Sequence, residues 1–289
     1  MKRLIALGLT LLTCGAAYAL PLGNPSEASL MCDGLFFEGP CADFCDPCVD
    51  WCDALSFRVG FYGDYVFNRH MEIDNNHNKG DNIEHFELYT NAGYLAFNAW
   101  DRIDIFATLG ATNFRLETNA VSFAGPGSGA VAGDRFVIQT ETDFSWSIGA
   151  RGTLYECGCC SFGIEGQYFY AKPDISRITS RDLDAVYPGN LELKYHEWQV
   201  GIGISYRIWN LVPYFGAKWS GAKVDMGDAV VAVSAITPVF NTLLSDLENR
   251  FNGGYVVGVS LIDCEKASLT VEARYPDEKA VYVNGQFRF

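Results

Sequence analysis

Apolar and polar side chains alternate along segment after segment of this sequence. Successive side chains of a β-strand point to opposite faces, so this period of two predicts strands with one apolar and one polar face. Phe144 and Trp146, for example, alternate with Ser145 and Ser147. The pattern predicts an all-β chain with ten strands, at 55–67, 89–99, 103–111, 142–154, 162–170, 197–207, 211–220, 255–261, 269–275 and 281–289.

The connections between these segments alternate between long and short. The long ones are rich in Asn, Asp, Gly and Ser and span 71–82, 115–135, 172–190 and 221–252. The short ones span 99–102, 155–160, 209–210 and 263–267. Outer-membrane barrels have this asymmetry, with long external loops and tight periplasmic turns. The spacing therefore favours a transmembrane antiparallel β-barrel.

The strands of a soluble β-sandwich also alternate apolar and polar residues. The polar face of each segment distinguishes a barrel from a sandwich. That face carries small and polar residues, which suit a crowded or water-filled lumen. Aromatic residues lie toward the strand ends, where interfacial girdles belong; they are Tyr65, Phe67, Trp100, Tyr168, Tyr170, Tyr206, Trp219 and Phe289. The last strand ends the chain on an aromatic residue, which also favours the barrel.

The N-terminus has the features of a signal peptide. Lys2 and Arg3 precede a short apolar run, and Ala17-Tyr18-Ala19 is a small-x-small cleavage site. Cleavage after Ala19 predicts three parts: a signal peptide at 1–19, a Cys-rich periplasmic segment at 20–54 and the barrel at 55–289. An acylated Cys14 is the alternative reading of the same region.

Ten cysteines are present, and nine remain after this cleavage. Disulfides are the default in an exported protein, although the first cluster also has spacing suited to zinc. A cluster of four cysteines lies just before the first strand and four more fall on the short connections, so both groups are expected at one rim. We predict disulfide bonds, including bonds to neighbouring molecules, for Cys41, Cys45, Cys48, Cys52, Cys157, Cys159, Cys160 and Cys264, and leave Cys32 open.

The polar faces of the strands supply the candidate pore lining. The predicted lumen residues are Arg58, Asp64, Asp104, Asp143, Arg151, Glu165, Glu197, Arg207, Lys218, Glu272, Arg274 and Arg288. Rings of one charge sign set the ion preference of a channel. Here the two signs are balanced, which predicts weak selectivity for small solutes and ions.

Other function classes find little support. The net charge of −14 argues against a nucleic-acid partner, because phosphate binding needs clustered Lys and Arg. An enzyme needs a nucleophile and a base held together, and the four histidines, His70, His77, His85 and His196, have no such companion motif. We therefore expect no catalytic residue, cofactor or metal.

Blocks of the sequence resemble the chlamydial major outer membrane porin family. They are 20–25, 45–48, 51–54, 63–67, 100–106, 144–147, 149–152, 156–159, 194–201, 211–214 and 284–289. The resemblance implies a homotrimeric diffusion porin in the outer membrane, 16 strands and disulfide cross-links between envelope proteins. This chain is short in its loops, so any even count from 10 to 16 strands is allowed. A structural or adhesive coat protein with little pore activity remains the alternative.

Overall fold

The computed structural model describes residues 20–30, 55–74, 83–119, 135–180, 183–184, 191–226, 230–233, 240–243, 246–263, 266–275 and 278–289. Within these ranges, no helix is long and apolar enough to cross a bilayer. The one short helix is α2 (Glu27–Leu30). The strands are β1 (Leu55–Arg69), β2 (Met71–Ile73), β3 (His85–Ala99), β4 (Ile103–Asn119), β5 (Arg135–Thr140), β6 (Asp143–Cys157), β7 (Cys160–Ala171), β8 (Ile175–Ser180), β9 (Leu183–Asp184), β10 (Lys194–Tyr206), β11 (Leu211–Asp225), β12 (Val230–Val233), β13 (Phe240–Leu243), β14 (Leu247–Asn249), β15 (Gly253–Asp263), β16 (Ala267–Tyr275) and β17 (Glu278–Arg288).

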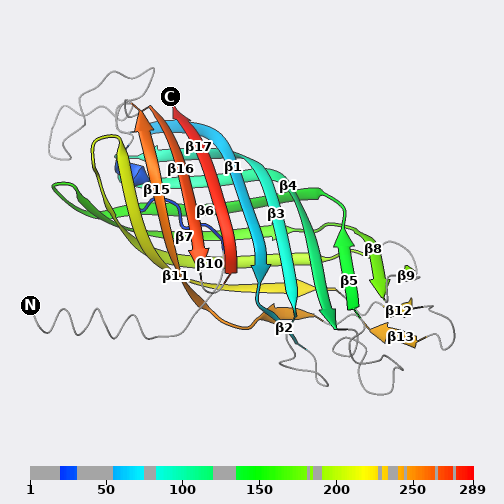
Figure 1. Cartoon of the computed structure of the whole chain (residues 1–289). Helices are drawn as coiled ribbons and strands as arrows, with labels where there is room; N and C mark the ends of the chain where they lie inside the picture. The colour runs from blue at the N-terminus through cyan, green and yellow to red at the C-terminus, as the bar shows by residue number, and fades with distance from the viewer. Residues whose placement is uncertain are drawn as a thin grey trace, which may run out of the picture.

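Ten long antiparallel strands close into a barrel (Figure 1). Their order around the wall is β3, β1, β17, β16, β15, β11, β10, β7, β6 and β4, and the pairing of β4 with β3 closes the ring. The first and last wall strands, β1 and β17, pair from Arg58↔Arg288 to Arg69↔Glu278. Closure gives almost every backbone group of the wall a partner, which a structure surrounded by lipid requires.

The side chains follow the predicted alternation on the wall strands. Exposed apolar residues face outward from every one of the ten, and Ile105 and Ile204 leave 56% and 53% of their surface accessible. Their neighbours Asp104 and Ser205 point inward and are buried. The all-β barrel predicted from the sequence is confirmed.

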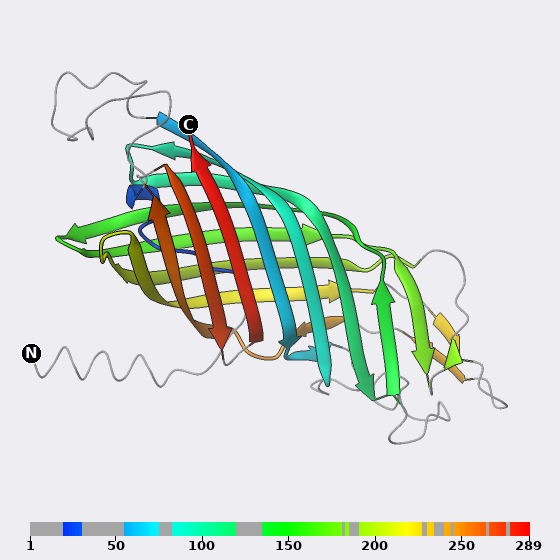
Figure 2. The ribbon, with the colours of Figure 1, turned by 45° about the horizontal axis from the view of Figure 1, so that its top comes forward.

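The two rims differ as predicted, and tight turns form one of them. At this short-turn rim, β3 is joined to β4 by 100–102, β6 to β7 by 158–159, and β10 to β11 by 207–210. Trp100 and Asp101 have positive φ angles of 54° and 51°, and Gly158 has one of 60°, as tight hairpin turns require. Both β1 and β17 also reach this rim (Figure 2).

The opposite, long-loop rim carries further strands, although sequence analysis predicted solvated loops there. β5 and β8 extend the sheet beyond β4, while β14 pairs with both β11 and β2. These strands lengthen the wall on one side and do not add members to the closed ring. Among the described residues the ring therefore has ten strands, and not the sixteen that the family resemblance implies.

An apolar core fills the barrel at the long-loop rim. Inward side chains from β3, β4, β7 and β10 meet there, and the ring of Tyr195 lies 5.1 Å from that of Phe114 and 5.9 Å from that of Phe169. Leu116, Ile138 and Ile178 bring in the strands beyond the rim. Burial of these side chains explains why β5 and β8 are ordered beyond the wall.

Candidate functional site

The barrel interior is lined by ionisable side chains, most of which pair with one another. Of the twelve residues predicted for the lumen, ten are buried inside the barrel: Arg58, Asp64, Asp104, Arg151, Glu165, Glu197, Lys218, Glu272, Arg274 and Arg288. Arg58 pairs with Asp104, Arg274 with Asp64, and Arg151 with Glu165 through Nε at 2.5 Å. Such mutual pairing is what makes buried charge tolerable.

Two residues of the predicted lining lie elsewhere. Asp143 is the first residue of β6, half-buried at the long-loop end. Arg207 lies beyond the end of β10, where its Nε donates to the carbonyl of Trp209 at 3.3 Å. The strand predicted from the sequence runs to Arg207, one residue past the end of β10. A side chain in the turn no longer follows the alternation between the two faces of the strand.

Two buried charged residues of the wall strands were not among the predicted lumen residues, Arg69 and Glu278. In simple alternation Arg69 shares the outward face of Phe67. The pairing of β1 with β17 shifts register between Val66 and Asn68, and such a bulge reverses which face the following side chains use. Arg69 therefore points inward.

Arg69 forms an ion pair that crosses the lumen. Its two terminal nitrogens each donate to Glu197 at 2.8 Å, and Tyr195 also donates to that carboxylate. Arg69 is on β1 and Glu197 on β10, and four wall strands separate these two in either direction around the ring. The pair therefore joins opposite sides of the barrel, next to the apolar core on the side that faces the short-turn rim.

Residues 20–29, here called the lumen segment, lie inside the barrel (Figure 2). Residues 20–28 are buried, and α2 begins near the short-turn rim, where Asn98 donates to the carbonyl of Ala28 at 2.9 Å. Sequence analysis placed all of 20–54 in a periplasmic segment outside the barrel. The structure differs for 20–29, because these residues bond to the inner wall along their whole length.

The wall supplies polar partners to the backbone of the lumen segment. Glu272 accepts the N–H groups of Leu22 and Gly23 at 3.1 and 2.8 Å. Gln199 donates to the carbonyl of Pro21 at 2.8 Å. Further contacts join Leu20 to Glu197 and Lys218, Asn24 to Ser260, Ser26 to Ser205, Pro25 to Thr153, and Glu27 to Arg58, Arg151 and Ser268.

Inward glycines on three adjacent wall strands make room for the lumen segment. A methyl group added at Gly201 or Gly216 would overlap the side chain of Leu22, and one at Gly163 would overlap the carbonyl of Pro25. These glycines come from β10, β11 and β7. They form a groove that fits this segment, and they are the feature of the sequence from which an occupant of the lumen could have been predicted.

The lumen segment, the cross-lumen pair and the apolar core together exclude water from the lining. A water-filled channel would leave its charged residues accessible, but Arg58, Glu197 and Glu272 each expose only 1% of their surface. The structure is therefore that of a closed lumen. At the short-turn rim, burial raises the pKa of Asp101, and the partner Arg288, 2.6 Å away, offsets part of that rise.

The cysteines can be placed only in part. Cys157 and Cys159 are exposed at the short-turn rim, and Cys160 is half-buried beside them. Within the described residues these three are free thiols. The predicted disulfides of Cys41, Cys45, Cys48, Cys52 and Cys264 fall outside the described residues, as does Cys32.

A closed antiparallel barrel with an apolar exterior and a charged interior defines an integral β-barrel protein of the outer membrane. The sequence model of the Chlamydia major outer membrane protein family matches residues 1–86, 73–187, 184–243 and 235–289. The chain belongs to this family.

Named relatives agree with this assignment. A major outer membrane porin of Chlamydia psittaci is 35% identical over 392 aligned positions, covering all of both chains. One of Chlamydia pneumoniae is 35% identical over 371 positions and covers 95% of each chain. The chain has 289 residues, so about a hundred positions of the first alignment are missing from it. A shortfall of that size is consistent with a ring of ten strands where the family resemblance implies sixteen.

Solved structures with a similar fold are more distant. An outer membrane channel from Pseudomonas putida F1 shares 10% identity at a TM-score of 0.38, covering 96% of this chain and 99% of that one. The translocator domain of the autotransporter NalP from Neisseria meningitidis shares 14% at 0.40, covering 81% and 86%. The outer membrane protease OmpT from Escherichia coli shares 13% at 0.35, covering 81% and 92%.

Proposed function

We propose that this protein is an outer-membrane porin that lets small solutes and ions diffuse passively through its barrel. Membership of the Chlamydia major outer membrane protein family carries this proposal. The polar interior supplies the physical means, because a solute among charged side chains avoids the cost of crossing hydrocarbon. The ten buried lumen residues predicted from the sequence are the proposed lining of the open path, and their mixed signs imply weak ion selectivity.

The closed lumen sets the condition for conduction. Because residues 20–29 occupy the groove of the inner wall, a solute path at the short-turn end requires this segment to move. Deleting residues 20–29 from the mature chain is expected to raise the current of each channel opening in planar bilayers several-fold, because an opening that displaces the apolar core and the Arg69–Glu197 pair then meets no segment in the groove, and the wall strands keep all of their own pairings.

A synthetic peptide of residues 20–29 provides the matched control. Added to the deleted channel, it is expected to reduce the current, whereas a scrambled peptide of the same composition is expected to leave it unchanged. Equal currents through the deleted and the complete mature chain would contradict the proposed path.

The filled lumen favours a second candidate, a structural coat protein of the outer membrane with little pore activity. A ten-stranded barrel has a narrow interior, and here apolar residues and the pair Arg69–Glu197 fill much of it. The same bilayer recording separates the two candidates. Channels from either chain support the porin, and the absence of current from both supports the coat protein.

We also propose that rim cysteines link this protein to neighbouring envelope proteins. Exposure of Cys157 and Cys159 at one rim supports this, because thiols there are open to other molecules. On non-reducing gels of whole cells, oligomers are expected that a thiol reductant converts to monomers. Replacing Cys157, Cys159 and Cys160 by serine is expected to weaken the oligomer bands, and an unchanged ladder would exclude these three thiols.

Two further properties are proposed from family membership. The protein is expected to form homotrimers, which chemical cross-linking in detergent would detect as a band at three times the monomer mass. It is also expected to be no enzyme. The proposed function uses no nucleophile or base, and three of the buried carboxylates of the lumen, Asp64, Asp104 and Glu165, are each paired with an arginine.

A further inference from the structure

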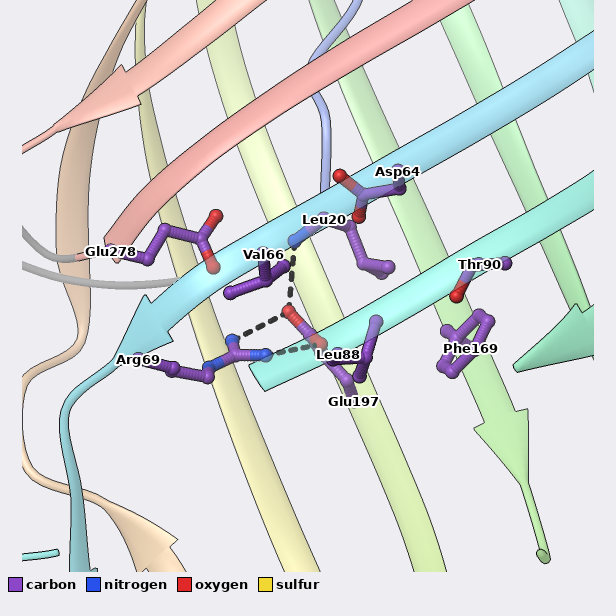
Figure 3. Close-up of a pocket in the computed structure, with 9 residues that line it drawn as sticks. All are labelled: Leu20, Asp64, Val66, Arg69, Leu88, Thr90, Phe169, Glu197 and Glu278. Carbon is purple, nitrogen blue, oxygen red and sulfur yellow. Dashed lines mark hydrogen bonds and ion pairs between the residues drawn. The ribbon is translucent and has the colours of Figure 1, made fainter. Parts of the chain in front are cut away.

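Leu20, the first residue of the lumen segment, contacts a buried carboxylate deep in the barrel through its backbone nitrogen. The backbone nitrogen of Leu20 lies 2.8 Å from Oε1 of Glu197, and Leu20 is only 4% exposed (Figure 3). Arg69 holds the same carboxylate from the other side with two bonds of 2.8 Å. The position of Glu197 is thus fixed independently of Leu20.

The surroundings of this nitrogen are rich in acidic groups. Asp64 and Glu278 line the same small pocket as Glu197 (Figure 3). Lys218 donates to Glu278 at 3.0 Å and to the carbonyl of Leu20 at 3.4 Å. Lys218 therefore contacts the backbone oxygen of Leu20, whereas the backbone nitrogen of Leu20 contacts the carboxylate of Glu197.

The buried charges of the interior do not balance. Among the described residues, seven buried carboxylates face six buried cations. The carboxylates are Glu27, Asp64, Asp104, Glu165, Glu197, Glu272 and Glu278, and the cations are Arg58, Arg69, Arg151, Lys218, Arg274 and Arg288. One of these cations, Arg288, pairs with Asp101 at the short-turn rim, so the acidic side chains outnumber the remaining cations, and a further cation inside the barrel would give them a favourable partner.

We propose that Glu197 is the binding site for the α-ammonium group of the mature chain. In the uncleaved chain the nitrogen of Leu20 belongs to a neutral amide. Hydrolysis of the Ala19–Leu20 bond consumes one water, leaves a carboxylate on Ala19 and frees an amine on Leu20. This amine takes up a proton near neutral pH, since an α-amino group ordinarily titrates at about 7.7–8.0.

Cleavage would thereby place one more cation in the interior, at the atom that already contacts Glu197. A charged donor forms a shorter and stronger hydrogen bond than a neutral amide does. Export processing would thus anchor the lumen segment and hold the channel closed until the segment is displaced. This inference rests on the cleavage site predicted from the sequence, and its effect on conduction rests on the proposed porin function.

The test measures how accessible the Leu20 amine is. The protein is purified from outer membranes, and mass spectrometry establishes that its first residue is Leu20. A small amine-acylating reagent is then applied in detergent, and modification of the N-terminal peptide is followed with time. In the folded wild-type protein, acylation of Leu20 is expected to be at least ten-fold slower than in urea.

Glu197→Gln is expected to speed this acylation several-fold, because the amide keeps the shape but loses the charge. Asp101→Asn is the control. It removes a carboxylate whose side chain binds Arg288 at the short-turn rim and not the lumen segment, so the Leu20 rate should remain that of the wild type. If Glu197→Gln does not fold, a chain with one glycine added before Leu20 is tested in its place. This addition leaves the barrel wall intact and moves the α-amine away from Glu197. That amine should react several-fold faster than the wild-type amine.

Three results would overturn the inference: a mature chain that starts at another residue, a Leu20 amine that reacts as fast folded as unfolded, or unchanged rates in folded Glu197→Gln or the glycine-extended chain. No current is measured in this test, so its outcome is independent of whether the barrel conducts.

Discussion

Replacing Arg69 by methionine is expected to lower the free energy of unfolding of the barrel by about 3–5 kcal/mol, the usual cost of removing one partner from a buried ion pair. Both terminal nitrogens of Arg69 bond to Glu197, and both side chains are 1% exposed. Without Arg69, the Glu197 carboxylate loses its main partner and remains buried. Urea titration of protein folded in lipid vesicles, followed by tryptophan fluorescence, measures the change.

The matched control removes both charges. Arg69→Met combined with Glu197→Leu is expected to cost less than Arg69→Met alone, because the Glu197 carboxylate is then no longer left buried without its arginine partner. If the free energy of unfolding of Arg69→Met lies within about 1 kcal/mol of the wild-type value, the loss is that of an exposed ion pair. That result would show that the Arg69–Glu197 pair does not cross a dry lumen.

Replacing Ile202 by arginine is expected to be the second large effect, at about 2–4 kcal/mol for an arginine at the bilayer midplane. Ile202 lies near the middle of β10, points outward and is 46% exposed. The cost arises because the outward surface meets hydrocarbon and not water. The same vesicle titration reports it.

Ile208 supplies the control for position. It is 51% exposed but lies in the turn between β10 and β11, at the short-turn rim. Ile208→Arg is expected to cost about 0–1 kcal/mol, as charged residues do near the membrane interface. Equal costs at the two positions would argue against a membrane boundary between them.

The wall of the barrel was predictable because its signal is local. Alternation at Phe144–Ser147 reports which face of a strand is apolar, and lipid outside the barrel makes that face the exposed one. Ten of the twelve predicted lumen residues are therefore buried inside. The failures occur where local phase is lost, at the bulge that turns Arg69 inward and at the strand end before Arg207.

The contents of the lumen were not predictable in the same way. Residues 20–29 carry no periodic pattern, and each bonds to wall residues that lie far away in the sequence, as Leu20 does to Glu197. The inward glycines, such as Gly201 and Gly216, make room for this segment, but no inference about an occupant was drawn from them in the sequence. Likewise, the strands beyond the long-loop rim are held by an apolar core whose side chains come from strands far apart in the sequence.

The account depends most on the outward apolar faces being in contact with lipid. The direct measurement is the folding of purified, urea-unfolded mature protein on dilution into buffer, with and without lipid vesicles, followed by circular dichroism and by protease resistance. We expect β-structure and protease resistance only when vesicles are present. A folded, protease-resistant and monodisperse protein in buffer alone would contradict a membrane barrel.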